Sequence, residues 1–292
     1  MLPARFWQVG PRQSLRLDEP GFIGVLNVTP DSFSDGGAYR SVAAAVDHAR
    51  RMLDSGACMI DVGGESTRPG AARVEASEQI HRTIPVIEAL RRTCDALISI
   101  DTTLAKVAEA ALDAGANVIN DVSAGTEDQR LLELAGQRRC GLILVHRLLP
   151  PPQDLYSDQY HHPPSYDDVS AVVGDWLAQR CRVAEAQGVD PAAIAIDPGL
   201  GFGKSVAQNY ELIRRTGEFV RTGRPVVSAA SRKSFIGAVT GVHEAAGRDG
   251  ASTAISVIHW QAGVRLFRVH CVAAHREALS VAGAVAGSPV PV

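Results

Sequence analysis

The stretch Met59-Ile60-Asp61-Val62-Gly63-Gly64-Glu65-Ser66-Thr67-Arg68-Pro69-Gly70 decides the fold class. Its first four residues are typical of a buried strand, although Asp61 places a charge where the side chain is expected to face the core. The strand runs directly into a glycine-rich polar loop. Arg68 in that loop offers a planar fork for a carboxylate or phosphate, and glycines let a backbone approach a ligand. Taken alone, such a loop is more often simply solvated, but the same order of apolar run and polar end recurs along the chain.

The composition indicates an ordinary globular protein. The chain has 292 residues, 46% of them hydrophobic and 21% charged, enough for one large domain or two small ones. A net charge of −3 gives no sign of a nucleic-acid-binding surface, and no apolar run is long enough to cross a membrane. The five cysteines are scattered without a C-x-x-C pair, which favours reduced thiols in a cytoplasmic protein.

Eight short apolar runs, each followed by a helical pattern, predict the architecture. They lie at 22–26, 59–62, 97–100, 118–119, 142–145, 194–196, 225–227 and 266–270. Strands without alternation are buried on both faces of a parallel sheet, and eight βα units in about 250 residues indicate a (β/α)₈ TIM barrel. A doubly wound open sheet is the alternative. We expect a hairpin over 1–20 packed on the barrel, the barrel itself over 21–287, and a frayed tail over 288–292.

In a barrel of this kind the polar strand ends meet at one face, where active sites are found. This face is expected to gather Asn27, Asp61, Arg68, Asp101, Asn120, His146, Asp197, Lys233, Arg268 and His270. Cations without a carboxylate beside them indicate an anionic ligand such as phosphate. The acidic and amide side chains indicate a heterocycle rich in N–H donors. A single oxygen ligand, Asn27, fits a magnesium ion that keeps its waters and bridges phosphates.

Several of these residues also have a purely structural interpretation. Asp61 is more simply a buried acceptor for loop N–H groups than a catalytic residue, and Lys204 is expected to be solvated. His146 fits a core position and a site position equally well. The glycine-rich segment 199–205 lacks the spacing of a nucleotide-binding P-loop. The loop 147–166 is longer than a connector needs to be, which indicates function or mobility.

Seven motifs together resemble the dihydropteroate synthases, a pterin-binding family, in that family's order and over nearly the whole chain. They occupy 27–37, 64–70, 99–102, 119–121, 197–204, 231–234 and 268–270. The resemblance implies condensation of 6-hydroxymethyl-7,8-dihydropterin diphosphate with para-aminobenzoate, giving 7,8-dihydropteroate and pyrophosphate in folate biosynthesis. It also implies a magnesium cofactor, a homodimer and a target of sulfonamides.

The resemblance further assigns roles to individual residues. The pterin is expected at Asp101, Asn120, Asp197 and Lys233, and the diphosphate at Thr67, Arg68, Arg268 and His270. Asn27 is the expected magnesium ligand. The aminobenzoate is expected between Pro69, Phe202 and Ser231, near Arg68 and Lys233. Catalysis is expected to depend on Arg68, Asp101, Lys233 and His270.

The chain departs from the family pattern at four positions: Val145, Arg147, Ala229 and Cys271. Cys271 replaces an aspartate that would orient His270. Two alternatives to a synthase stay open, and Cys271 favours only the second of them. One is a pterin-binding barrel of other activity, such as a methyltetrahydrofolate-dependent methyltransferase, which would not need Arg68 and Arg268. The other is a non-catalytic pterin-binding paralogue.

Overall fold

A computed structural model describes residues 4–28 and 37–287 of the chain. Most of the polar motif at 27–37 and the tail at 288–292 lie outside these residues. Within them, no helix is long and apolar enough to cross a membrane. All five cysteines fall in the described part and are free thiols.

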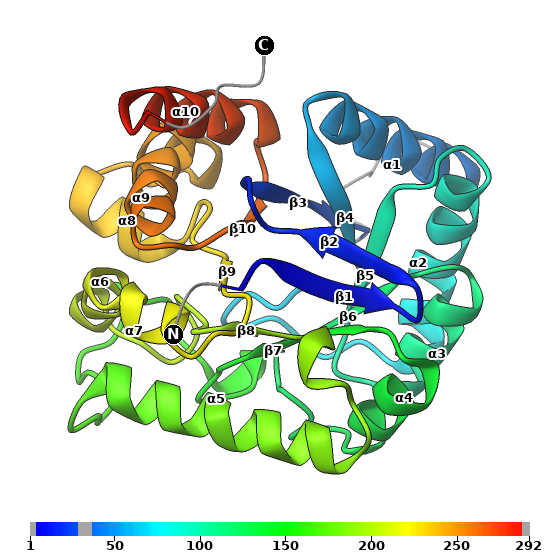
Figure 1. Ribbon diagram of the computed structural model, residues 1–292, viewed down its shortest axis with the longest axis horizontal. Helices are drawn as coiled ribbons and strands as arrows, with labels where there is room; N and C mark the ends of the chain where they lie inside the picture. Colours follow the sequence, from blue (N-terminus) through cyan, green and yellow to red (C-terminus); the bar gives the residue numbers. More distant parts are fainter. Residues whose placement is uncertain (1–3, 29–36, 288–292) are drawn as a thin grey trace.

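Eight parallel strands form the central sheet, and its order in space confirms the predicted barrel (Figure 1). The strands are β3 (Gly21–Asn27), β4 (Ala57–Gly63), β5 (Leu97–Asp101), β6 (Val118–Asp121), β7 (Gly141–Val145), β8 (Ile194–Asp197), β9 (Val227–Ser228) and β10 (Leu266–Val269). The order β8-β7-β6-β5-β4-β3-β10-β9 leaves only β8 and β9 to meet. A bridge between Ile196 and Val226 joins them, with a 2.9 Å hydrogen bond from Ile196 N to Pro225 O. The doubly wound open sheet is therefore excluded.

Helices follow the strands and surround the sheet (Figure 1). They are α1 (Gly37–Asp54), α2 (Ala76–Arg91), α3 (Ala105–Asp113), α4 (Arg130–Arg138), α5 (Val169–Ala186), α6 (Val206–Arg214), α7 (Thr216–Val220), α8 (Ser234–Thr240), α9 (Asp249–Gln261) and α10 (Val272–Val285). Single 3₁₀ turns lie at η2 (Pro151–Gln153), η3 (Pro191–Ala193) and η4 (Ala245–Arg248). The β7–α5 connection, with η2 inside it, is the long loop noted in the sequence.

The strands divide the core into two layers because successive side chains point to opposite faces. Outward residues such as Ile60, Ile98 and Leu142 pack against the helices in one cluster. Inward residues such as Met59 and Ile143 form a second cluster inside the barrel. Each fully buried side chain of this size contributes about 1.5–3 kcal/mol through burial. The strands therefore read as continuous apolar runs, although their two faces have different partners.

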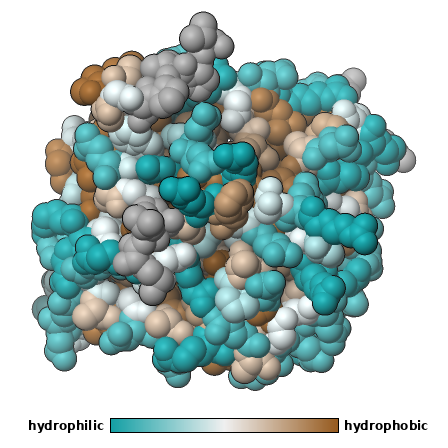
Figure 2. Space-filling model, viewed as in Figure 1, coloured by the Kyte–Doolittle hydropathy of each residue, from teal (hydrophilic) through white to brown (hydrophobic). Residues whose placement is uncertain are grey.

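An antiparallel hairpin, β1 (Phe6–Gly10) and β2 (Gln13–Arg16), lies across the N-terminal end of the barrel (Figure 1). Trp7 and Val9 are fully buried in the inner cluster, and Trp7 Nε1 donates a 2.8 Å hydrogen bond to Ala193 O. The hairpin thus closes the N-terminal end of the barrel, opposite the C-terminal ends of the strands where the polar residues lie. The outer surface on this hairpin side of the molecule is largely hydrophilic, with separate apolar patches (Figure 2).

Candidate active site

The inward positions of the strands change from apolar to polar toward the C-terminal end of the barrel. In β4 the alternate residues are Met59 and Asp61, and in β5 they are Leu97, Ser99 and Asp101. Register places Asp61 opposite Ser99. The polar layer is therefore set by strand pairing and lies directly on the apolar inner core.

Arg268 of β10 joins the carboxylates of this layer. Its Nε donates to Asp61 Oδ2 and its Nη2 donates to Asp101 Oδ2, each at 2.7 Å. Both carboxylates are buried; burial acts to lower the pKa of Arg268, and the two negative charges outweigh it and raise that pKa. The prediction that Arg268 has no carboxylate beside it is wrong, because the sequence separates these partners by 207 and 167 residues.

Asp61 is a fully buried acceptor as expected, but within residues 4–28 and 37–287 its donors are side chains and not the N–H groups of a loop. Its partners are the side chains of Ser99, Asn120 and Arg268. Asn120 Nδ2 donates to Asp61 Oδ2 at 3.0 Å. Asp61 therefore fixes the orientation of two residues that were predicted to bind ligand.

Asp101 keeps one oxygen unused. Its Oδ1 is buried and has no hydrogen-bond partner among the described residues. Burial raises the pKa of Asp101 to about 7, while Arg268 opposes the rise and Asp61 adds to it. A buried acceptor without a partner costs stability, so this oxygen is available for a ligand that donates an N–H group.

Asp197, at the end of β8, is buried beneath the glycine-rich loop. Its Oδ1 accepts a 2.7 Å hydrogen bond from Gly199 N. Burial raises its pKa, while that N–H group and the charge of Lys233 oppose the rise. Lys233 Nζ lies 3.9 Å from the centre of the Phe202 ring, and burial lowers its pKa to about 8. The structure thus brings these three predicted residues together.

His270 is held by a serine. Its Nδ1 lies 3.0 Å from Ser231 Oγ, and its backbone N donates to the same oxygen at 3.3 Å. Burial, together with the charges of Arg232 and Arg268, lowers the pKa of His270 to about 3. Cys271 begins α10 as the N-cap residue and makes no capping hydrogen bond. The ring is therefore neutral and fixed from the Ser231 side.

A cavity of about 430 Å³ opens above the polar layer. Nine predicted residues line it: Asn27, Thr67, Arg68, Pro69, Phe202, Ser231, Lys233, Arg268 and His270. Asp101, Asn120 and Asp197 lie in the buried layer of the barrel and are not among the lining residues. Sequence reasoning missed other lining residues: Tyr156, Asp158, Gln159, Arg232, His243 and Arg248. For the first three, the length of the 147–166 loop was the available signal.

Arg248 and Asp249 support the loop that presents Ser231 and Lys233. Arg248 donates to the backbone oxygens of Val242, His243 and Arg232. Arg232 forms two 2.7 Å hydrogen bonds with the Asp249 carboxylate, and these lower the pKa of Asp249. These hydrogen bonds therefore hold the loop with Ser231 and Lys233 in place at this side of the cavity.

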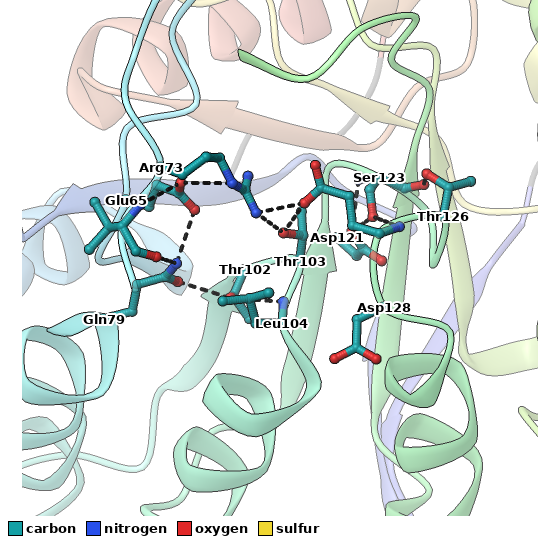
Figure 3. A network of polar contacts seen from close by, with 12 residues as sticks. Glu65, Arg73, Gln79, Thr102, Thr103, Leu104, Asp121, Ser123, Thr126 and Asp128 are labelled. Atoms are coloured by element: carbon teal, nitrogen blue, oxygen red, sulfur yellow. Dashed lines mark hydrogen bonds and ion pairs between the residues drawn. The ribbon is translucent and has the colours of Figure 1, made fainter. Parts of the chain in front are cut away.

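A polar network closes the base of the loop that contains Thr67, Arg68 and Pro69 (Figure 3). Glu65 Oε1 accepts from Val74 N at 3.1 Å, so the two ends of the loop are tied together. Arg73 lies between Glu65 and Thr103, and it also donates to Glu127 at 2.8 Å. The buried Arg147 side chain pairs with the other oxygen of Glu127. Arg147, one of the four departures from the family pattern, therefore has an ion-pair partner in the structure.

Lys204 and His146 form a buried pair behind the glycine-rich loop. Lys204 is fully buried, which corrects the prediction that it is solvated. Its Nζ lies 2.9 Å from each of three acceptors, which are His146 Nδ1, Gly199 O and Phe202 O. Burial lowers the pKa of Lys204 to about 7 and that of His146 to about 2. His146 packs edge-on against Trp176 of α5, so it belongs to the core and not to the cavity.

In the part of the chain that the structure describes, the site offers a metal ion single oxygen donors and no cage. Across residues 4–28 and 37–287, no three His, Cys, Asp or Glu side chains are grouped as a metal cage would require. Asn27 lines the cavity and offers one amide oxygen. Such a donor set fits magnesium, which keeps several waters and bridges phosphate oxygens of a substrate.

A family model, related sequences and solved structures all indicate one protein family for this chain. The family model described as "Pterin binding enzyme" matches residues 23–270. The dihydropteroate synthase of Streptococcus pyogenes is 44% identical over 260 residues, which cover 89% of this chain and 93% of the relative.

Two solved structures of Xanthomonas albilineans dihydropteroate synthase are also similar. The structure with 4-aminobenzoic acid has a TM-score of 0.88 and 40% identity, and the match covers 98% of this chain and 100% of that one. The complex with 7,8-dihydropteroate has a TM-score of 0.86 and 38% identity, with 97% and 100% covered.

Proposed function

The chain belongs to the dihydropteroate synthase family. We propose that three groups of residues at the C-terminal end of its barrel bind the pterin, the diphosphate and the aromatic amine in the synthase reaction. The enzyme joins 6-hydroxymethyl-7,8-dihydropterin diphosphate to para-aminobenzoate and releases 7,8-dihydropteroate and pyrophosphate. The observation that supports the proposed division best is Arg268. It lies between the buried carboxylates of the barrel and the cation-lined cavity above them.

The first group binds the pterin in the buried layer. The pyrimidine edge of a pterin presents adjacent ring and exocyclic N–H groups, which pair bidentately with one carboxylate. Asp197 is this carboxylate in our proposal, with Lys233 beside it. The unpartnered Oδ1 of Asp101 and the amide of Asn120 satisfy the remaining polar edge of the ring.

The second group binds the diphosphate. Thr67, Arg68, Arg268 and His270 line the same cavity as Asn27, the proposed magnesium ligand. Arg268 uses Nε and Nη2 on carboxylates, so Nη1 remains for an anion. His270 is neutral and donates one N–H group. Magnesium, when bound, neutralises part of the diphosphate charge.

The third group binds the aromatic amine. Phe202, Pro69 and Ser231 line the same cavity and provide an apolar surface with one hydroxyl group. Lys233 lies over the Phe202 ring and is therefore next to both the pterin and the amine. Arg68 contributes a positive charge near the carboxylate of para-aminobenzoate.

The bond changes follow from this placement. The amine nitrogen bonds to the pterin methylene while the carbon–oxygen bond to the diphosphate breaks, and the proton on nitrogen passes to solvent. Because an aniline is a weak nucleophile, the residues on the leaving side must stabilise the departing pyrophosphate. Arg68, Arg268 and His270 meet this need by electrostatic stabilisation. Asp101 stabilises the positive charge that develops on the pterin methylene, so no covalent enzyme intermediate is needed.

The domain organisation and setting of the enzyme are part of the same proposal. We infer one catalytic barrel over 21–287 with the hairpin at 1–20 as its cover, acting as a cytoplasmic homodimer. Val145 and Ala229 are buried near the site, and Arg147 pairs with Glu127, so these departures leave the polar layer intact. The affinity of sulfonamides, which resemble the amine, is expected to depend on Phe202, Pro69 and Ser231.

A turnover assay tests this function. Purified protein is mixed with the pterin diphosphate, magnesium and para-aminobenzoate, and pyrophosphate release is followed. Release is expected only when all three are present, and Arg68→Ala should reduce it strongly. A protein that binds the pterin but releases no pyrophosphate would be the non-catalytic paralogue, and the proposal would then fail.

A further inference from the structure

The loop 147–166 is attached to the rest of the site in its middle. Asp154 is 4% exposed, and its carboxylate accepts from Gly203 N at 3.0 Å and from the Tyr160 hydroxyl. Ser157 N donates to Ser234 Oγ at 3.1 Å, and Asn209 Nδ2 donates to Ser157 Oγ at 3.0 Å. Length alone allowed either function or mobility, and these contacts fix the loop in place.

Its two ends are held as well. Pro151 O accepts a 2.7 Å hydrogen bond from Gly70 N, and the Tyr166 hydroxyl donates to Gly203 O at 3.0 Å. Gly203 has a φ of +65°, and a Cβ there would lie 2.3 Å from Leu148 Cβ. The loop therefore contacts the neighbours of Pro69, Phe202 and Lys233, which are residues proposed to surround the amine.

The tip of the loop faces the cavity. Tyr156, Asp158 and Gln159 are lining residues, and a 2.8 Å hydrogen bond from Gln159 N to Tyr156 O closes the turn between them. The lining contains five cationic side chains: Arg68, Arg232, Lys233, Arg248 and Arg268. Among the described residues that line the cavity, Asp158 supplies the one carboxylate.

We propose that the 147–166 loop is a fixed wall of the aromatic-amine subsite and that Tyr156 and Asp158 determine its specificity. Tyr156 limits the size of the amine, because its loop is anchored on both sides and cannot move away. Asp158 disfavours an anionic amine relative to a neutral one, because its charge opposes that of the surrounding cations. The inference rests on the proposed placement of the amine and assigns a role to a segment outside the recognised motifs.

The charge effect is tested by calorimetric titration with magnesium and pyrophosphate present. The ligands are 4-aminobenzoate, an anion, and sulfanilamide, which is neutral near pH 7. Asp158→Asn should tighten 4-aminobenzoate about two- to fivefold, as expected for one exposed charge, and leave sulfanilamide nearly unchanged. Asp167→Asn is the matched control, since Asp167 is exposed directly after the same loop but does not line the cavity. Equal effects on both ligands would overturn the role of Asp158.

The size effect is tested with a sulfanilamide that has a heteroaromatic ring on its sulfonamide nitrogen. Tyr156→Ala should tighten this larger ligand at least about threefold relative to sulfanilamide, because the wall becomes shorter. Leu155→Ala is the control, since Leu155 is 45% exposed and lies outside the cavity. An unchanged or weakened preference for the larger ligand contradicts the proposal.

These titrations do not depend on turnover. Failure of the pyrophosphate-release assay counts against the proposed function. If the ratio of the two ligand affinities is unchanged in the Tyr156 and Asp158 variants, only the specificity role of the 147–166 loop is refuted.

Discussion

The buried layer of the barrel and the loops above it hold their charges in different ways. In the layer, Arg268 bonds to Asp61 and Asp101, and all three side chains come from strands. Above it, Arg68 is exposed, and its loop is tied through Glu65 and through the contact between Gly70 and Pro151. The comparison indicates that the half proposed to bind the pterin is formed before any ligand arrives, whereas the half proposed to bind the amine depends on the arrangement of loops.

The largest expected difference between the two regions concerns stability. Arg268→Ala leaves two buried carboxylates without their cation and should cost about 3–5 kcal/mol of unfolding free energy. Arg68→Ala removes an exposed side chain and should change stability by no more than about 0.5 kcal/mol, although activity falls. Urea unfolding of both variants measures the difference. Equal losses of unfolding free energy in the two variants would show that Arg268 and Arg68 contribute equally to stability.

Binding of the pterin gives the next largest effect. Asp197→Asn retains an acceptor for Gly199 N but replaces one carboxylate oxygen with an amide that cannot accept from the pterin. The loss of pterin affinity should be about 2–5 kcal/mol, as for buried polar groups left unpaired. Isothermal titration calorimetry measures it, and unchanged affinity would make Asp197 a structural residue.

The two regions should also respond to pH with opposite signs. Burial raises the pKa of Asp101 to about 7, so the folded protein holds this proton more tightly than the unfolded chain. The contribution of Asp101 to stability is therefore present in acid and is lost as pH rises from about 4 through 7. The hydrogen bonds from Arg232 lower the pKa of Asp249, so its contribution is present at neutral pH and is lost on acidification.

Urea unfolding at several pH values separates these contributions. Relative to Asp101→Asn, the wild-type protein should lose stability between about pH 4 and pH 7, because only the wild type ionises at that position. Relative to Asp249→Asn, it should lose stability below about pH 4. Parallel curves for wild type and Asp101→Asn would contradict the raised pKa.

The sequence predicted the buried layer better than the loops. Strand ends indicated Asp101, Asn120 and Asp197 because strand register gathers such positions at one end of a barrel. It did not predict that Arg268 pairs with Asp61, since residues 207 positions apart leave no local pattern. It also placed Lys204 in solvent, because burial there depends on the path of the glycine-rich loop over His146. Tyr156 and Asp158 belong to no periodic element, so only the length of their loop was informative.

A smaller effect is expected at Cys271. Because Ser231 fixes the His270 ring, Cys271→Asp should change turnover within about tenfold, or ~1.4 kcal/mol in the barrier. His270→Ala should cost more and act on the diphosphate substrate and not on the amine. Steady-state kinetics with each substrate varied in turn measures both variants. An inactive wild type that gains strong activity on Cys271→Asp would instead identify a decayed pterin-binding protein.

The order of binding tests the difference between the preformed layer and the loop-built half most directly. The measurement is calorimetric titration of para-aminobenzoate into the protein, with and without magnesium and pyrophosphate. We predict that the anion orders the Arg68 side of the cavity and tightens the amine at least about tenfold, ~1.4 kcal/mol, while the pterin binds without it. Equal amine affinity under both conditions would contradict the account, because both halves of the site would then be formed in advance.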